Sequence, residues 1–176
     1  GESPGVSAHY RVADTKAGNG LRYTFYALPP DIREMPSFAT LKPVANGICY
    51  ESDFFAPDFL DLRARYPKDM AVCFAGWLEI DKEGPYTFHI WTKGGSKLYI
   101  KSEMVLNNRR LGDSDTKGEI YLEKGRHPFR LEYARKQHIR PEVQEIINLE
   151  YEGEGMTRRK IPADRLFLKK TGNETG

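Results

Sequence analysis

Long apolar runs are absent from this chain, and so is any large excess of one charge. No run of about 18 consecutive apolar residues occurs in the 176-residue sequence, which excludes a transmembrane helix. The 27 lysines and arginines nearly balance the 25 aspartates and glutamates, leaving a net charge of +2. This balance creates no field that would draw the chain to nucleic acid or into a membrane, so we expect neither as a partner.

Cysteine and histidine are scarce, and the motifs of common catalytic centres are missing. The two cysteines, Cys49 and Cys73, are too few and too far apart for a zinc site. Because both lie in strand-like runs, they form either a disulfide between neighbouring strands of an exported protein or two buried free thiols. No G-x-S-x-G motif, H-E-x-x-H motif or phosphate-binding glycine loop occurs. The sequence therefore predicts no catalytic residue.

Paired carboxylates, which a glycosidase needs on either side of a cleft, are not placed for that chemistry. Asp58 and Asp61 fall on an expected short surface helix, and Asp113 and Asp115 fall in an expected loop. We interpret all four as solvated surface acids.

Short runs in which apolar and polar residues alternate fill most of the chain. Tyr86, Phe88 and Ile90 recur at every second position, which is typical of a strand with one buried face. A second alternating run follows the corner Lys93-Gly94-Gly95-Ser96. Further strands are expected over residues 21–28, 47–55, 70–80, 120–122, 127–133, 146–151 and 160–168. So many short strands predict an all-β fold, a β-sandwich or jelly-roll-like barrel with short helical turns in its loops.

Turn residues between these runs predict how the strands are joined. Residues 81–84 and 123–125 each end in glycine, and each is expected to close a hairpin between the strands on either side. Residues 153–159 should form a turn. The remaining expectations are a proline-rich loop over 31–45 with one helical turn near 31–34, a short helix over 57–66, and an exposed loop over 107–118.

Length and composition indicate one domain with flanking segments. The 39% of hydrophobic residues are enough for a single core. Residues 1–19 hold few large apolar groups and are expected to form an extended arm. Residues 20–170 would form the domain, and residues 171–176 a frayed tail.

Several motifs resemble the PA14 (protective antigen) domain. The segment W-L-E-I-D-K-E-G-P-Y-T-F and the later G-S-K-L-Y-I are similar to the family's central strands. Further similar segments are G-L-R-Y at 20–23, G-R-H-P-F-R-L-E-Y at 125–133 and I-P-A-D-R-L at 161–166. They follow the family's order over residues 20–168. The resemblance implies a β-sandwich of jelly-roll character.

The resemblance also implies where a calcium ion would lie. In the carbohydrate-binding members, two consecutive aspartates at the corner after the Y-T-F strand, joined by a cis peptide, ligate Ca²⁺, which holds sugar hydroxyls. These positions are Lys93 and Gly94 here. An ammonium group does not replace the anionic oxygens that the ion prefers. Unless Asp113, Asp115 and nearby carbonyls compensate, no calcium, other metal or cofactor is expected.

Polar residues near this corner are candidates for a binding rim at one end of the sandwich. The predicted ligand-binding residues are Lys93, Gly94, Gly95, Asn107, Asn108, Arg109 and Gln137. Cationic and amide groups suit hydroxyl-rich or anionic glycans, although a solvated loop edge has the same composition. Trp77 and Trp91 are either sugar-stacking platforms or ordinary core residues.

Residue pattern and resemblance together predict a non-catalytic carbohydrate-binding module of a secreted, periplasmic or cell-surface protein. We expect a monomer whose partner is a glycan or a cell-surface protein, without the family's usual calcium site. One alternative is a structural or protein-interaction module that braces a larger surface assembly. Another is an accessory domain with glycoside hydrolase activity.

Overall fold

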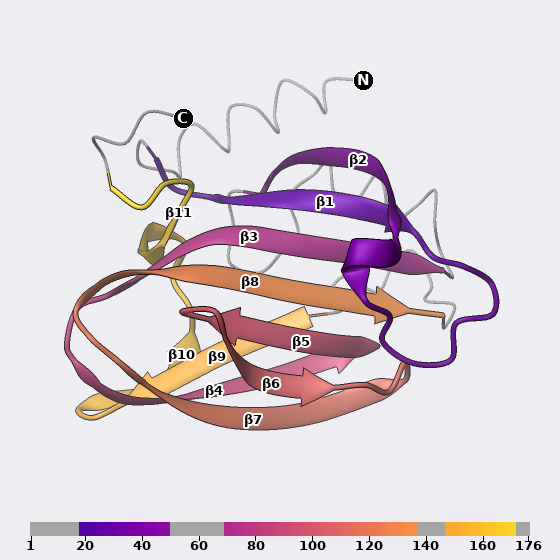
Figure 1. The fold of residues 1–176 in the computed structure, drawn as a ribbon. Coiled ribbons are helices and arrows are strands. Elements are labelled where there is room, and N and C mark those ends of the chain that lie inside the picture. The colour runs from indigo at the N-terminus through magenta and orange to yellow at the C-terminus, as the bar shows by residue number, and fades with distance from the viewer. Residues whose placement is uncertain (1–17, 50–68, 137–146, 172–176) are drawn as a thin grey trace, which may run out of the picture.

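Two antiparallel sheets packed face to face make up the described part of the chain, which confirms the predicted all-β sandwich (Figure 1). The computed structural model describes residues 18–49, 69–136 and 147–171. The larger sheet, among these residues, contains β1 (Leu21–Ala27), β2 (Lys42–Cys49), β3 (Met70–Ile80), β5 (Gly95–Ile100), β6 (Glu103–Asn108), β8 (Gly125–Arg135) and β11 (Leu166–Phe167). The smaller sheet contains β4 (Gly84–Lys93), β7 (Asp113–Leu122), β9 (Ile147–Gly153) and β10 (Met156–Lys160).

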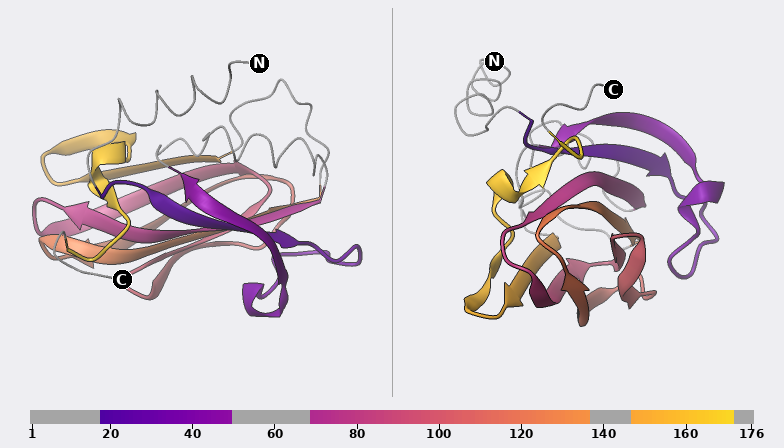
Figure 2. Two further views of the ribbon diagram at one scale, coloured as in Figure 1. Left: turned by 90° about the horizontal axis from the view of Figure 1, so that it is seen from above. Right: turned by 60° about the vertical axis from the view of Figure 1, so that its left-hand side comes forward.

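Neighbouring strands in each sheet are mostly distant in sequence. The larger sheet has the order β2-β1-β3-β8-β5-β6, with β11 paired to β3. The smaller sheet has the order β10-β9-β4-β7. Figure 2 shows the two layers from above and from the side. No helix in the described ranges is long and apolar enough to cross a membrane.

Both predicted hairpins are wrong. β3 and β4 lie in different sheets, and so do β7 and β8. The turns at 81–84 and 123–125 therefore carry the chain from one layer to the other. Alternation identifies the buried face of a strand but not its partner, because every strand of a sandwich buries one face against the same core.

Three predicted loop regions contain regular structure. Within the expected loop over 31–45, a 3-10 helix occupies Phe38–Thr40 instead of 31–34, and β2 already begins at Lys42. β7 begins at Asp113, inside the expected loop over 107–118, because its polar first residues pair with the end of β4. β10 replaces the last part of the expected turn over 153–159. The predicted helix over 57–66 and most of the predicted arm lie outside the described residues.

The core lies between the two sheets, and a second cluster lies on the outer face of the larger sheet. Phe25, Phe74, Phe88, Phe129 and Tyr133 are among the fully buried residues of the core. We call the second group the outer cluster: Leu28, Met35, Phe38, Leu41, Ala71, Cys73 and Ala134. The loop between β1 and β2 thus packs on the sheet rather than extending into solvent.

The two cysteines are buried on opposite sides of the larger sheet and form no disulfide with each other. Cys49 belongs to the core between the sheets and Cys73 to the outer cluster. Of the two alternatives from the sequence, the pair of buried thiols is therefore the one that the fold contains.

The side of the sandwich where β6 meets β7 depends on one glycine. A Cβ at Gly118 would lie 1.9 Å from the carbonyl oxygen of Val105. That distance is far inside van der Waals contact, so only glycine allows the two strands to come this close.

We expect Gly118→Ala to lower the free energy of unfolding by about 3 kcal/mol, the upper part of the usual range for overpacking. Gly112→Ala is the matched control, because no atom of the described residues lies within 4 Å of the added Cβ, and its effect should stay within about 0.5 kcal/mol. Urea denaturation measures both values. Equal effects of the two substitutions would contradict the conclusion that the close approach of β6 and β7 requires glycine at position 118.

The Cys73 thiol should make stability depend on alkaline pH. Burial raises the pKa of Cys73 from its ordinary value of 9.0 to about 11. A group with a raised folded-state pKa stabilises the fold below its unfolded pKa, and this stabilisation is lost as the pH rises from 9 toward 11. Between pH 8 and pH 11, wild type should lose about 2 kcal/mol more unfolding free energy than Cys73→Ala. Denaturant titrations across this range test the difference, and identical pH profiles would contradict it.

Candidate functional site

The corner between β4 and β5 is a packed crossing between the two sheets. A Cβ at Gly94, whose φ is +154°, would lie 2.5 Å from the carbonyl oxygen of Ala134. A Cβ at Gly95 would lie 2.7 Å from the carbonyl oxygen of Arg110 and equally close to the side chain of Met35. Both positions are buried. The glycines therefore allow β8 on one side and two loops on the other to close over the crossing.

Polar side chains beneath the corner bind its backbone carbonyls. The Tyr133 hydroxyl donates to the Lys93 carbonyl at 2.6 Å. The Thr92 hydroxyl donates to the Gly94 carbonyl at 2.6 Å, and the Asn108 amide donates to the same oxygen at 3.5 Å. Thr92 is fully buried and Asn108 is 8% exposed. The carbonyl oxygens of the corner are thus engaged inside the protein.

The Lys93 side chain lies on the outer face of the smaller sheet. Its ammonium nitrogen is 5.2 Å from the centroid of the Trp91 ring, within the range of a cation–π contact. Asp115, which pairs with Trp91 in register, is exposed. A Ca²⁺ ion needs six to eight oxygen ligands, several of them carboxylates. Among the described groups, the corner instead offers an ammonium group, a glycine and two engaged carbonyls, and these do not fit this ion.

Three segments converge beside the corner and form two adjoining hollows. One hollow, of about 350 Å³, is lined by residues 30–33, Leu111 and Lys136. The other, of about 410 Å³, is lined by residues 33–34 and 109–111. Arg33 and Leu111 line both hollows. We call this surface, residues 30–34, 109–111 and Lys136, the cationic rim.

An ion pair and hydrogen bonds to backbone carbonyls hold the rim together. Arg109 donates to both carboxylate oxygens of Glu34, at 2.9 and 3.0 Å. Arg109 thereby holds the pKa of Glu34 below its ordinary value. The Met35 amide donates to the Arg109 carbonyl at 3.0 Å, and Lys136 donates to the Pro30 carbonyl. The loop between β1 and β2 is in this way tied to the loop between β6 and β7.

The seven predicted binding residues occupy separate positions. Three of them are buried in or beneath the corner: Gly94, Gly95 and Asn108. Arg109 lines one hollow of the rim, and Asn107 is exposed on β6 beside it. Lys93 lies with Trp91, and Gln137 lies outside the described residues. Whether any of them contacts a ligand stays a prediction.

Sequence patterns missed the contribution of residues 30–34. This segment is far from Arg109 in sequence, and its prolines indicate only an irregular loop. The one signal in the sequence is that two apolar residues, Ile32 and Met35, flank the charged pair Arg33 and Glu34, which suggests a loop with a buried side and a charged side.

Comparisons with known proteins agree with this fold. The PA14 domain model matches residues 64–165. A PA14 sugar-binding domain from an RTX adhesin has a TM-score of 0.66 and 15% identity, and the match covers 87% of this chain and 99% of that one. The epithelial adhesin 9 A domain from Candida glabrata, in complex with Galβ1-3GlcNAc, has a TM-score of 0.61 and 15% identity, covering 89% and 93%.

A third similar structure is longer than this chain. An anti-sigma factor domain-containing protein from Clostridium clariflavum has a TM-score of 0.64 and 17% identity, and the match covers 90% of this chain. The chain spans about half, 49%, of that protein's length. A search among curated proteins gives no significant match. At these identities the similar structures establish the fold alone.

Restoring two acids at the corner should not create a calcium site. In Gly94→Asp, the new Cβ would collide with the Ala134 carbonyl, so we expect a loss of about 3 kcal/mol in unfolding free energy. Lys93→Asp, which adds no such collision, is the matched control and should lose less. Thermal unfolding with calcium chloride and with EDTA should give equal midpoints for each protein. A higher midpoint in calcium for the double variant Lys93→Asp/Gly94→Asp would contradict the closed corner.

Proposed function

Because the chain belongs to the PA14 domain family, we propose that it is a non-catalytic carbohydrate-binding module whose cationic rim contacts a glycan. The main observation behind this proposal is that three loop segments converge at one end of the sandwich and form two adjoining hollows. The sugar-binding domain of the RTX adhesin and the Candida adhesin in complex with Galβ1-3GlcNAc support it. A glycan ligand also suits a secreted or cell-surface protein.

The charge of the rim favours an acidic glycan. Its four cationic residues are Arg33, Arg109, Arg110 and Lys136, and its two acids are Asp31 and Glu34. Glu34 is already paired with Arg109. Planar guanidinium groups donate two parallel hydrogen bonds to a carboxylate or sulfate, which neutral hydroxyls match less well. A uronic acid or a sulfated sugar is therefore the ligand class that we propose for the rim.

Binding without calcium is part of the proposal. The engaged carbonyls and the ammonium group at the corner support it, because a calcium-dependent site would need those positions to supply oxygen ligands. The rim offers direct cationic donors in place of a bridging ion. Binding should therefore weaken with ionic strength rather than with chelation.

Glycan-array binding with and without EDTA, followed by calorimetry on acidic oligosaccharides that bind, tests the proposal. We expect EDTA to have no effect. Arg33→Ala and Arg110→Ala should each weaken binding about tenfold, the loss typical of a central charged contact. Both side chains are suitable because, unlike Arg109, neither has an ion-pair partner among the described residues.

Arg159→Ala is the matched control for these variants. Arg159 is an exposed arginine on β10, in the smaller sheet, and within the described part of the chain its side chain donates only to the nearby Thr157 carbonyl, at 3.2 Å. Its loss should leave the affinity unchanged. Equal losses in all three variants would indicate nonspecific charge attraction. Absence of binding to any glycan would overturn the proposal and favour a structural or protein-interaction module.

A further inference from the structure

A pocket on the outer face of the larger sheet lies away from the cationic rim. It has a volume of about 420 Å³ and is lined by Tyr99, Ser102, Pro128, Phe129, Arg130 and Glu132. These residues come from the β5–β6 hairpin and from β8, which pairs with β5. The pocket is at the Ile100 end of β5, whereas the rim packs over its Gly95 end. The two surfaces are therefore separate parts of the molecule.

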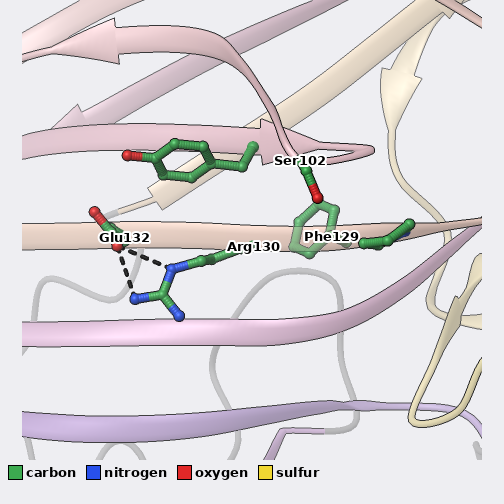
Figure 3. Close-up of a pocket in the computed structure, with 6 residues that line it drawn as sticks. Ser102, Phe129, Arg130 and Glu132 are labelled. Atoms are coloured by element: carbon green, nitrogen blue, oxygen red, sulfur yellow. Dashed lines mark hydrogen bonds and ion pairs between the residues drawn. The ribbon is translucent and has the colours of Figure 1, made fainter. Parts of the chain in front are cut away.

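An ion pair between neighbouring residues of β8 forms the polar end of the pocket. Arg130 donates from Nε at 2.9 Å and from Nη2 at 2.8 Å to the same oxygen of Glu132 (Figure 3). The Glu132 side chain is only 8% exposed, whereas that of Arg130 is 41% exposed. Among the described residues, neither Glu132 Oε1 nor Arg130 Nη1 forms a hydrogen bond or an ion pair. The pair thus retains one acceptor and one donor group for a ligand.

The opposite end of the pocket depends on a left-handed turn. Lys101 and Ser102 have φ values of +59° and +66°, a conformation that costs non-glycine residues about 1 kcal/mol or more each. The Lys101 amide donates to the Pro128 carbonyl at 2.9 Å, which fixes the turn against β8. Figure 3 shows Ser102 at this end of the pocket, whereas the Phe129 side chain belongs to the core between the sheets. The turn therefore brings the Ser102 hydroxyl group to the end of the pocket that Pro128 lines.

Tyr99 adds an aromatic face and a further donor. Burial, with a contribution from Glu132, raises the pKa of its hydroxyl above the ordinary value, so the group keeps its proton at neutral pH. Tyr99 pairs with Arg130 in register, so the ring lies beside the ion pair. Rings of this kind pack against the C–H face of a sugar, and the neighbouring polar groups bind its hydroxyls.

We propose that this pocket is a second saccharide site and takes a neutral pyranose residue. The charges of Arg130 and Glu132 cancel, which disfavours a charged ligand, and together they offer the paired donor and acceptor that adjacent sugar hydroxyls match. The volume is within the usual range for small-ligand pockets. The inference rests on the proposed carbohydrate-binding function but uses none of the rim residues.

A polar path connects the pocket with the rim along the outer face. Lys97 pairs with Glu132 on one side and with the exposed Asn107 on the other. Lys97 also helps to lower the pKa of Glu34 in the rim, so its charge acts at that end as well.

Backbone-amide NMR titration of the whole chain tests the pocket. The probes are the methyl glycosides of glucose, galactose, mannose and N-acetylglucosamine, with an oligogalacturonate as the acidic probe. At least one neutral glycoside should shift the amide signals of Tyr99, Ser102 and Arg130. Tyr99→Ala should weaken that interaction at least tenfold, and Tyr121→Ala, which removes an exposed tyrosine of the smaller sheet, should not change it.

Ser102→Gly keeps the test independent of folding defects. Glycine accepts the left-handed turn, so this variant should fold at least as stably as wild type while binding the glycoside more weakly. If oligogalacturonate shifts amide signals at the rim and no glycoside shifts them at the pocket, the proposed second saccharide site is overturned. The proposed function would still stand. No shifts with any probe would overturn both.

Discussion

The contact on which the structure depends most is the one between Gly94 and the backbone of β8. The chain crosses there from the smaller sheet to the larger one, and the Ala134 carbonyl occupies the space that any side chain at Gly94 would need. Gly95 permits the same approach from the other side, where Met35 and the Arg110 backbone pack. The two loops of the cationic rim are consequently seated on this crossing.

The closed crossing decides which groups remain available to a ligand. Tyr133, Thr92 and Asn108 bind the corner's carbonyls from within, so these oxygens contribute to folding rather than to ligand binding. A neutral hydrogen bond of this kind stabilises the fold by about 1 kcal/mol, and losing it would leave a buried carbonyl without a partner. Ligand-accessible polar groups are found instead on the rim above the crossing and at the far end of β5.

Sequence alternation was enough to identify most strands and their buried faces. Tyr86, Phe88 and Ile90 are buried as their spacing predicts. Strand partners were not predictable, because a period of two identifies the buried face of a strand but not the strand beside it. The turns at 81–84 and 123–125 also have the same residue types whether they close a hairpin or connect the two sheets. The start of β7 at Asp113 was missed for a related reason: its polar residues form a strand only because β4 supplies a ladder partner.

The candidate binding surfaces were only partly accessible to sequence reasoning. Arg109 stood out as a cation near a strand end, but its pairing with Glu34 depends on a loop about 75 residues away in sequence. The sequence contains no motif that indicates the pocket at Tyr99. Its residues alternate with core residues, as the residues of an ordinary solvated strand face also do. Tertiary proximity, rather than any local motif, creates both surfaces.

The most direct test of the closed crossing is a crystal structure determined with calcium present and with anomalous diffraction data. The Tyr133 hydroxyl should remain within hydrogen-bond distance of the Lys93 carbonyl, with no anomalous peak beside the Gly94 carbonyl. A calcium ion bound to those two carbonyls, with the Tyr133 and Thr92 hydroxyls displaced from them, would contradict the closed crossing.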